Sequence, residues 1–204
     1  GEFARAAGIE VRVGGNLGVP ALDLLEGPPV AMYVLELSSY QLETTHSLQL
    51  EAGAVLNVTP DHFDRYRDLA EYAAAKARIF ERCATAIVNL DDELVVRMPR
   101  PGQRRVGFSL RRHDADFRLL PKDGEDWLAA GSVPLLPVAA LRLPGRHNAA
   151  NALAALAIGS VAGIPAEAMT GALRRFEGLP HRSQLVAERQ GVRWIDDSKG
   201  TNVG

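Results

Sequence analysis

Short runs rich in Val, Ile and Leu recur along the first half of the chain, at residues 9–13, 30–37, 54–58 and 84–90. Polar residues or glycine follow each run, which is typical of buried strands that end in loops. Residues 69–83 contain neither Gly nor Pro, and their apolar positions recur at helical spacing. Strands that alternate with helices favour an α/β fold in which helices cover both faces of a mostly parallel sheet.

The second half of the chain has a different pattern. Strand candidates at 106–109, 117–120, 127–129 and 140–143 are separated by turn residues, which predicts a small antiparallel meander appended to the parallel sheet. Helices are expected at about 147–162 and 166–176. Gly178-Leu179-Pro180 then breaks the pattern before a further strand at 192–196. We therefore predict one unit over residues 1–179 and the start of a second over 180–204.

Composition narrows the functional classes. Hydrophobic residues make up 47% of the chain and charged residues 24%, which is typical of a globular protein. The net charge of -2 gives no support for a nucleic-acid or anionic-membrane partner, because both need a basic face. Cys83 is the only cysteine and cannot form an internal disulfide, so a reducing cytoplasm is expected. The uncharged stretch 148–166 is rich in Ala and interrupted by Gly and Pro, which favours a buried helix over a membrane span.

Candidate chemistry gathers where the predicted strands end. Gly14-Gly15-Asn16-Leu17-Gly18 follows the first strand, and it either brings backbone amides close to a ligand or makes a tight turn into a helix. Glu36 ends the second strand. A carboxylate there is costly unless it binds a cation or forms a salt bridge, and both remain open.

The third strand ends in a polar segment, residues 57–65, that contains Asp61, His62 and Asp64. These side chains could bind a divalent metal or carry out acid–base chemistry. The same segment could begin a helix that is capped by Thr59, with Pro60 in the first turn, and the two interpretations are compatible.

Lys76 falls inside the apolar stripe of the predicted helix. The stripe consists of Leu69, Tyr72, Ala73, Ile79, Phe80 and Cys83. A lysine at this position buries its stem, so its ammonium must reach solvent, pair with an anion or change its chemistry.

Polar residues in the last third of the chain suggest contacts with a nucleotide. Asn148 and Asn151 share one face of a helix, where they cap it or present amides to a planar ligand. Arg182 could grip phosphate and Asp197 could accept ribose hydroxyls, although hinge salt bridges are the alternative. A phosphate loop of the form G-x-x-x-x-G-K-[ST] does not occur in these residues.

Seven motifs occur in the order in which Mur ligases carry them, so the chain resembles this family over essentially its whole length. The motifs are Gly14-Gly-Asn-Leu-Gly18, Glu36-Leu-Ser-Ser-Tyr-Gln-Leu-Glu43, Asn57-Val-Thr-Pro-Asp-His-Phe-Asp-Arg65, Ala74-Ala-Lys-Ala-Arg78, Gly145-Arg-His-Asn-Ala-Ala-Asn151, Gly178-Leu-Pro-His-Arg182 and Asp197-Ser-Lys-Gly-Thr-Asn202. The first, second and last are similar to those of the members that add D-glutamate. Gly200 departs slightly, since the family often has Ala there.

The resemblance implies an ATP-dependent amide ligase of peptidoglycan precursor synthesis in the cytoplasm. Such ligases phosphorylate the alanine carboxylate of UDP-N-acetylmuramoyl-L-alanine, and D-glutamate then attacks the acyl phosphate. By resemblance, residues 1–179 are most of the central ATP-binding domain, and 180–204 begin a Rossmann-like C-terminal domain. The family's phosphate loop would precede residue 1, so these residues alone are expected to be inactive. The family also implies a monomer.

The resemblance also implies roles for individual residues. Glu36 and His62 resemble Mg²⁺ ligands, and Lys76 resembles the family's carbamylated lysine, an anion that can bind metal. The residues expected to contact the muramoyl-alanine substrate are Asn16, Ser38 and Gln41. Those expected to contact ATP are Asn148, Asn151, Arg182 and Asp197.

Three alternatives remain. Within the family, the chain could come from a ligase for another amino acid or from a folylpolyglutamate synthase. A different enzyme class is a metal-dependent hydrolase that uses Glu36, Asp61, His62 and Asp64, although this leaves both asparagines and Asp197 unexplained. A third possibility is a folded piece that binds weakly and catalyses nothing.

Overall fold

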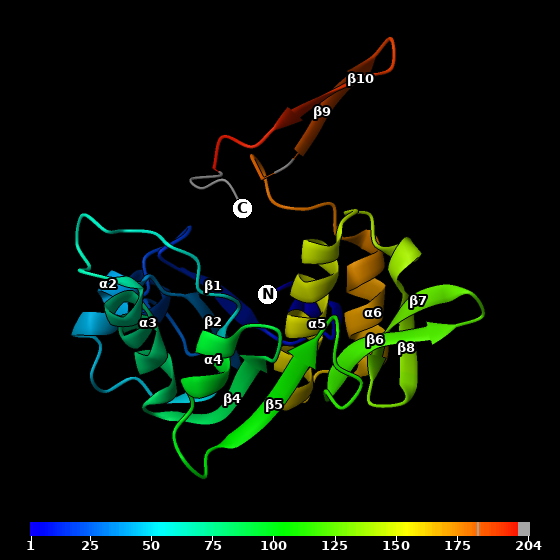
Figure 1. Ribbon diagram of the computed structural model, residues 1–204. Helices are drawn as coiled ribbons and strands as arrows, with labels where there is room; N and C mark the ends of the chain where they lie inside the picture. Colours follow the sequence, from blue (N-terminus) through cyan, green and yellow to red (C-terminus); the bar gives the residue numbers. More distant parts are fainter. Residues whose placement is uncertain (183, 200–204) are drawn as a thin grey trace.

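The computed structural model of the chain describes residues 1–182 and 184–199. Within them, two parallel strands, a mixed sheet of six strands and a two-stranded hairpin form three separate sheets (Figure 1). Gly200, Thr201 and Asn202 of the last motif lie outside the described residues.

The smaller parallel sheet consists of β1 (Val11–Gly15) and β2 (Met32–Glu36). Helix α1 (Glu2–Ala6) precedes it, and the short turn η1 (Asp23–Leu25) lies between the strands. Helix α2 (Ser39–Thr44) follows β2 and was not predicted. The predicted strand at 9–13 was placed two residues too early.

The parallel part of the larger sheet is formed by β3 (Leu50–Val55), β4 (Cys83–Asn89) and β5 (Arg104–Ser109). The predicted strand at 54–58 overlaps β3 only at Ala54 and Val55, because the chain leaves the sheet after Val55. The other two strands lie close to their predicted positions.

A meander completes the sheet. β6 (Phe117–Lys122) pairs in parallel with β5, and β7 (Glu125–Ala130) and β8 (Val133–Pro137) follow as antiparallel strands. The fold class is therefore α/β with a mostly parallel sheet and a small antiparallel part, as predicted. The strand at 106–109 was expected in the antiparallel meander, but β5 pairs in parallel with both β4 and β6. The strand predicted at 140–143 was wrong. Its place is taken by β8, whose prolines hide the strand signal but are tolerated on an edge strand.

In the described residues, six helical segments lie against the larger sheet. They are α3 (Leu69–Ala77), η2 (Arg78–Phe80), α4 (Glu93–Arg97), η3 (Val138–Ala140), α5 (Arg146–Val161) and α6 (Ala166–Arg175). The helix predicted at 69–83 was too long, because its end tightens into η2 and Cys83 already pairs with Leu50 as the first residue of β4. Within the described residues, no helix combines the length and apolarity needed to cross a membrane.

The two faces of the sheet bury different clusters. Helix α5 contacts β3 to β7, and Ile87 of β4 faces its cluster. The neighbouring Ala86 and Val88 face the opposite cluster, which includes residues of α3 and α4. This alternation is expected of a strand buried on both sides. The prediction that helices cover both faces is therefore confirmed.

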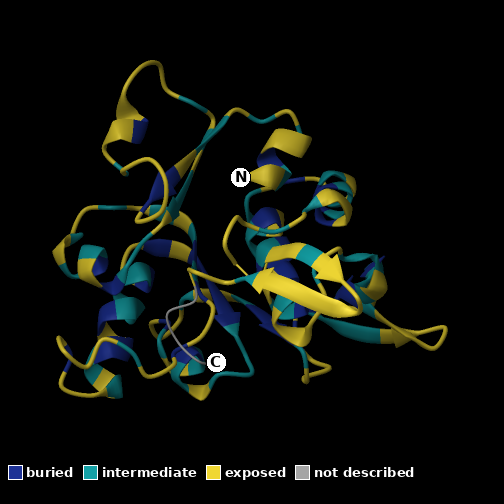
Figure 2. Ribbon diagram, turned by 90° about the horizontal axis from the view of Figure 1, so that it is seen from above, coloured by how far each residue is buried: buried dark blue, intermediate teal, exposed yellow. Residues whose placement is uncertain are grey.

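The hairpin of β9 (Gln184–Arg189) and β10 (Val192–Asp196) extends away from the rest of the chain (Figure 1). Most residues of the hairpin are exposed, and Figure 2 draws them in yellow. β10 was predicted at 192–196, whereas β9 was not. The domain boundary near residue 180 stays a prediction.

Candidate functional site

The glycines at the end of β1 allow close packing of the backbone. A Cβ at Gly14 would lie 2.1 Å from the Val19 carbonyl oxygen, and one at Gly15 would lie 2.1 Å from that of Glu36. The chain loops back after Gly15 so that Val19 bridges to β1, rather than turning directly into a helix. Asn16, expected to contact substrate, is exposed, and its amide donates to the Glu36 carbonyl at 2.7 Å.

Ser38 and Gln41, also predicted to contact substrate, form a capping box at the start of α2. The Gln41 amide donates to Ser38 Oγ at 3.2 Å, and the Ser38 amide donates to Gln41 Oε1 at 3.0 Å. Capping boxes satisfy the free N–H groups at a helix start. The bonds fix both side chains, two and five positions after Glu36, and they do not use the side-chain nitrogen Nε2 of Gln41.

His62 lies in a turn beyond β3. It adopts a left-handed conformation with φ of 57°, and its carbonyl accepts hydrogen bonds from the amides of Arg65 and Tyr66. Asp61 Oδ1 accepts from the His62 amide at 2.8 Å, and Asp61 Oδ2 lies 3.5 Å from Nε2 of the ring. The helix that Thr59 and Pro60 were predicted to begin does not form here, because the next helix starts at Leu69.

Lys76 is half-buried on α3, and its Nζ lies 4.7 Å from the centroid of the Tyr72 ring. The His62 ring meets the same tyrosine edge-on, with centroids 5.7 Å apart. The structure thus brings together two of the predicted metal-site residues, His62 and Lys76, through a buried ring. A cation over a ring face is attracted by the ring's quadrupole, so this contact between Lys76 and Tyr72 is favourable.

The rings continue into a cluster that joins α2, the turn and α3. The ring centroids of Tyr40 and His62 lie 5.1 Å apart, and those of Tyr66 and Tyr72 lie 5.2 Å apart. The Arg65 guanidinium carbon lies 4.9 Å from the Tyr40 centroid. Arg65 also pairs with Glu43, and this hydrogen bond lowers the pKa of the carboxyl. Burial raises the pKa of Tyr66.

Glu36 is exposed at the end of β2, four positions before Tyr40 along the chain. The salt bridge considered for it does not form with any described residue. Across residues 1–182 and 184–199, no three His, Cys, Asp or Glu side chains converge closely enough to hold a metal. A hydrolase site made of Glu36, Asp61, His62 and Asp64 therefore gains no support. Mg²⁺ makes smaller demands on protein side chains, because it retains water and binds substrate phosphates.

At the start of α5, Asn148 and Asn151 do not serve as the helix cap. The cap is Gly145, which makes no side-chain hydrogen bond. The Asn148 side chain instead donates to the Pro144 carbonyl at 2.8 Å, and Asn151 is exposed. The capping alternative is therefore wrong, and binding of a planar ligand stays a prediction.

Arg182 and Asp197 lie at the base of the hairpin, and both are exposed. Asp196 forms an ion pair there, with its Oδ2 2.6 Å from His181 Nδ1. The His181 ring, together with the Ser198 amide, lowers the pKa of Asp196 to about 2. No contact in the described residues tests the predicted roles of Arg182 and Asp197 in ATP binding.

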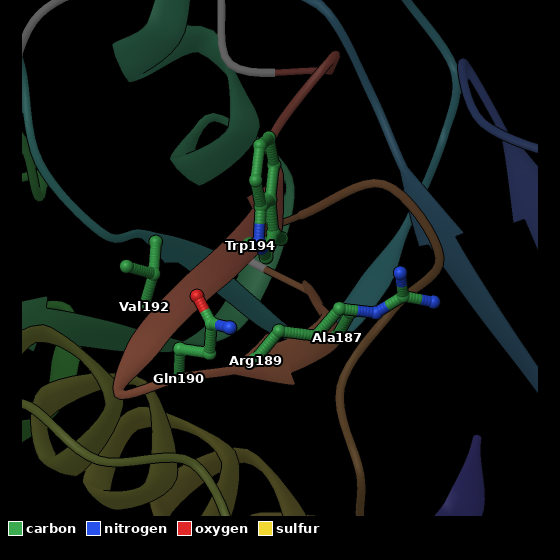
Figure 3. Close-up of a pocket in the computed structure, with 5 residues that line it drawn as sticks. All are labelled: Ala187, Arg189, Gln190, Val192 and Trp194. Atoms are coloured by element: carbon green, nitrogen blue, oxygen red, sulfur yellow. The ribbon is translucent and has the colours of Figure 1, made fainter.

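A hollow of about 830 Å³ lies on the hairpin (Figure 3). It is lined by Ala187, Arg189, Gln190, Val192 and Trp194. It shares no residue with the predicted site and is formed on exposed strands, so we assign no function to it.

The sequence interpretation missed two contributors to the site. Tyr72 precedes Lys76 by four residues, a spacing that places the two side chains on one face of a helix and would have indicated the contact. Arg78 donates to the carbonyls of Leu42 at 2.8 Å and Thr45 at 3.3 Å, which ties the end of α2 to η2. No local pattern indicates Arg78, because its partners lie more than thirty positions away.

Comparison with known proteins gives a family match over most of the chain. Residues 16–159 match the Mur ligase middle domain. A UDP-N-acetylmuramoylalanine--D-glutamate ligase of Nitrosococcus oceani is 52% identical over 203 residues, which cover 99% of this chain and 45% of that protein. The enzyme of the same name from Escherichia coli is 50% identical over 205 residues, covering 100% of this chain and 46% of its own length.

Solved structures agree in fold. MurF from Acinetobacter baumannii superposes with a TM-score of 0.73 at 20% identity, over 96% of this chain and 47% of that one. A pseudomurein peptide ligase type C from Methanothermus fervidus gives 0.74 at 15% identity, over 96% and 49%. The chain thus spans about 45% of the length of the relatives that it matches in sequence.

Proposed function

The chain belongs to the Mur ligase family through its middle domain, and we propose that the protein containing it is an ATP-dependent ligase of peptidoglycan precursor synthesis. The reaction adds D-glutamate to UDP-N-acetylmuramoyl-L-alanine. The γ-phosphate of ATP passes to the alanine carboxylate, and ADP leaves. The amine of D-glutamate then attacks the acyl phosphate, so an amide and inorganic phosphate are released and the amine loses a proton.

One observation carries the proposal: the His62 ring and the Lys76 ammonium meet at the Tyr72 ring. The chain that contains these residues is 50% to 52% identical to two UDP-N-acetylmuramoylalanine--D-glutamate ligases over nearly its whole length.

We propose that Glu36 would bind the Mg²⁺ at the phosphates of ATP, that His62 would bind a second Mg²⁺, and that Lys76 would also be a metal ligand. Lys76 contributes after its neutral amine adds CO₂, which gives a carbamate and one proton. When bound, Mg²⁺ offsets charge on the phosphate oxygens during transfer. The capping box would keep Ser38 and Gln41 rigid, because its two hydrogen bonds fix both side chains.

The remaining residues would bind the two substrates. Asn16, Ser38 and Gln41 would face the muramoyl-alanine, and the side-chain nitrogen Nε2 of Gln41, which the capping box does not use, would be a donor. Asn148 and Asn151 would contact adenine, Arg182 the phosphates and Asp197 the ribose. We place the enzyme in the cytoplasm as a monomer. Residues 1–204 alone should not turn over, because they contain no phosphate loop to hold ATP.

The test is phosphate release by the full-length protein. Release should require ATP, UDP-N-acetylmuramoyl-L-alanine and D-glutamate together. Equal rates with L-lysine or diaminopimelate in place of D-glutamate would overturn the amino-acid assignment. Release with a folate substrate and L-glutamate would favour a folylpolyglutamate synthase, and phosphate-ester cleavage without ATP would favour a hydrolase.

A further inference from the structure

Beyond the last backbone pairs of β3 and β4, two side chains take over the hydrogen bonds between them. Val55 and Val88 are the final backbone pair. Asn89 Nδ2 then donates to the Leu56 carbonyl at 2.8 Å, and Asp92 Oδ2 accepts from the Val58 amide at 2.8 Å. In a parallel ladder, a carbonyl and the amide two residues later face the same neighbouring strand. The two side chains therefore replace the N–H and C=O that β4 would have presented had it continued.

We propose that Asp92 is a positioning residue for the site, acting on His62 through Val58. This inference rests on the proposed function, because it assumes that His62 binds the metal and phosphate side of the ligands. Val58 is buried, and the hydrogen bond from its backbone N–H to Asp92 anchors the segment that reaches His62 four residues later. A displacement of about 1 Å in such a segment is enough to reduce catalysis strongly.

Asp92 also has a second structural role, and the variants have to separate it from the hydrogen bond to Val58. Its other oxygen, Oδ1, accepts from the amides of Leu94 at 2.9 Å and Val95 at 3.2 Å, which caps α4. Asp92→Asn can keep an oxygen on α4, but it then turns an amide NH₂ toward the Val58 N–H, so two donors face each other. Asp92→Ser also keeps a helix cap, and its side chain is too short to bridge to Val58 as well.

The neighbouring Asp91 supplies a matched control. Its Oδ1 accepts from Ser109 Oγ at 2.6 Å and its Oδ2 accepts from the Leu110 amide at 2.7 Å. Asp91 thus fixes the end of β5, on the flank of β4 opposite to His62. Asp91→Asn makes the same change of atoms and removes one acceptor, that of the Ser109 hydroxyl or of the Leu110 N–H, but it leaves Val58 paired.

The experiment compares the full-length wild type with D92N, D92S and D91N. Mn²⁺ affinity is measured by titration calorimetry with the ATP analogue AMP-PNP present, the KM for Mg²⁺ is separated from kcat, and hydrogen exchange is followed in peptides covering residues 56–66. For D92N and D92S we expect Mn²⁺ affinity to fall ~10-fold, KM for Mg²⁺ to rise more than kcat falls, and exchange to speed up in 56–66. D91N should change Mn²⁺ affinity less than about threefold.

Equal Mn²⁺ affinity and equal exchange in 56–66 for D92N, D92S and D91N would overturn the inference. A wild type that binds no Mn²⁺ would instead count against the proposed function, and exchange in 56–66 would still decide whether Asp92 anchors the segment. Circular dichroism and thermal transitions show that each variant is folded. If D92N does not fold, D92S provides the same comparison.

Discussion

Two regions of the molecule contain the same kinds of contact in different surroundings. The site region comprises α2, residues 57–66 and α3, and the meander region comprises residues 110–137. Each has a lysine over an aromatic ring, at 4.7 Å for Lys76 and Tyr72 and at 4.6 Å for Lys122 and Trp127.

Each region also has an arginine paired with a carboxylate that has a lowered pKa. The pairs are Arg65 with Glu43 and Arg112 with Asp114. In the site region, the rings of Tyr40, His62 and Tyr72 join the arginine and the lysine into one connected set. In the meander region, the lysine contact lies at a hairpin and the arginine pair is local and exposed. A single contact therefore does not distinguish the two regions, whereas the sharing of partners among contacts does.

The largest expected difference between the regions is in activity. In the full-length enzyme, Lys76→Ala should lower phosphate release about 100-fold, because it removes a proposed metal-site residue. Lys122→Ala removes an equivalent ring contact and should leave the rate within about twofold of the wild type. Short carboxylic acids should partly restore activity to the Lys76 variant alone. Equal losses in both variants would contradict the assignment of the site.

A second difference concerns stability. Tyr72→Ala removes a buried ring and should lower the free energy of unfolding by about 3 kcal/mol. Trp127 is half-buried at the surface of the meander, so Trp127→Ala should cost about 1 kcal/mol. Urea denaturation followed by circular dichroism measures both. A cost for Trp127 as large as that for Tyr72 would show that the two rings are equally integrated.

The smallest effect is on the titration of the two carboxyls. Because each pKa is lowered in the folded state, each pair stabilises the fold above the carboxyl's ordinary pKa, and this contribution is lost as pH falls through the lowered value. Arg65→Ala should raise the pKa of Glu43 toward 4.5, and Arg112→Ala should raise that of Asp114 toward 3.8. Carbon-13 NMR measures both. Only the Arg65 variant should also shift the ring signals of Tyr40. Tyr40 signals that are the same in this variant and the wild type would contradict the contact between Arg65 and the ring.

The hydrophobic pattern was sufficient to predict the fold class and most strands, because burial on one or both faces sets the period of apolar residues. It failed at β8, where prolines on an edge strand resemble a loop, and at the end of α3, where pairing of Cys83 with Leu50 overrides the helical pattern. The short helix α2 was missed because its start depends on a capping box rather than on apolar periodicity.

The candidate site could be predicted only in part. The polar strand ends and Lys76 stand out locally, and the resemblance assigns their roles. By contrast, the meeting of His62 with Tyr72 depends on how a turn with a left-handed histidine folds back onto α3. Asp92 and Arg78 act on segments more than thirty positions away, and a single sequence contains no local sign of such long-range partners.

The contact between Gly15 and the Glu36 carbonyl limits how this corner of the molecule could be redesigned. Gly15 has φ of 120° and no room for a methyl group, so an engineer who wished to add a contact beside Asn16 could not place a side chain there. Gly18 also has a positive φ, of 77°, but open space surrounds it. New polar groups would have to enter at position 18, where asparagine or aspartate tolerates the left-handed backbone.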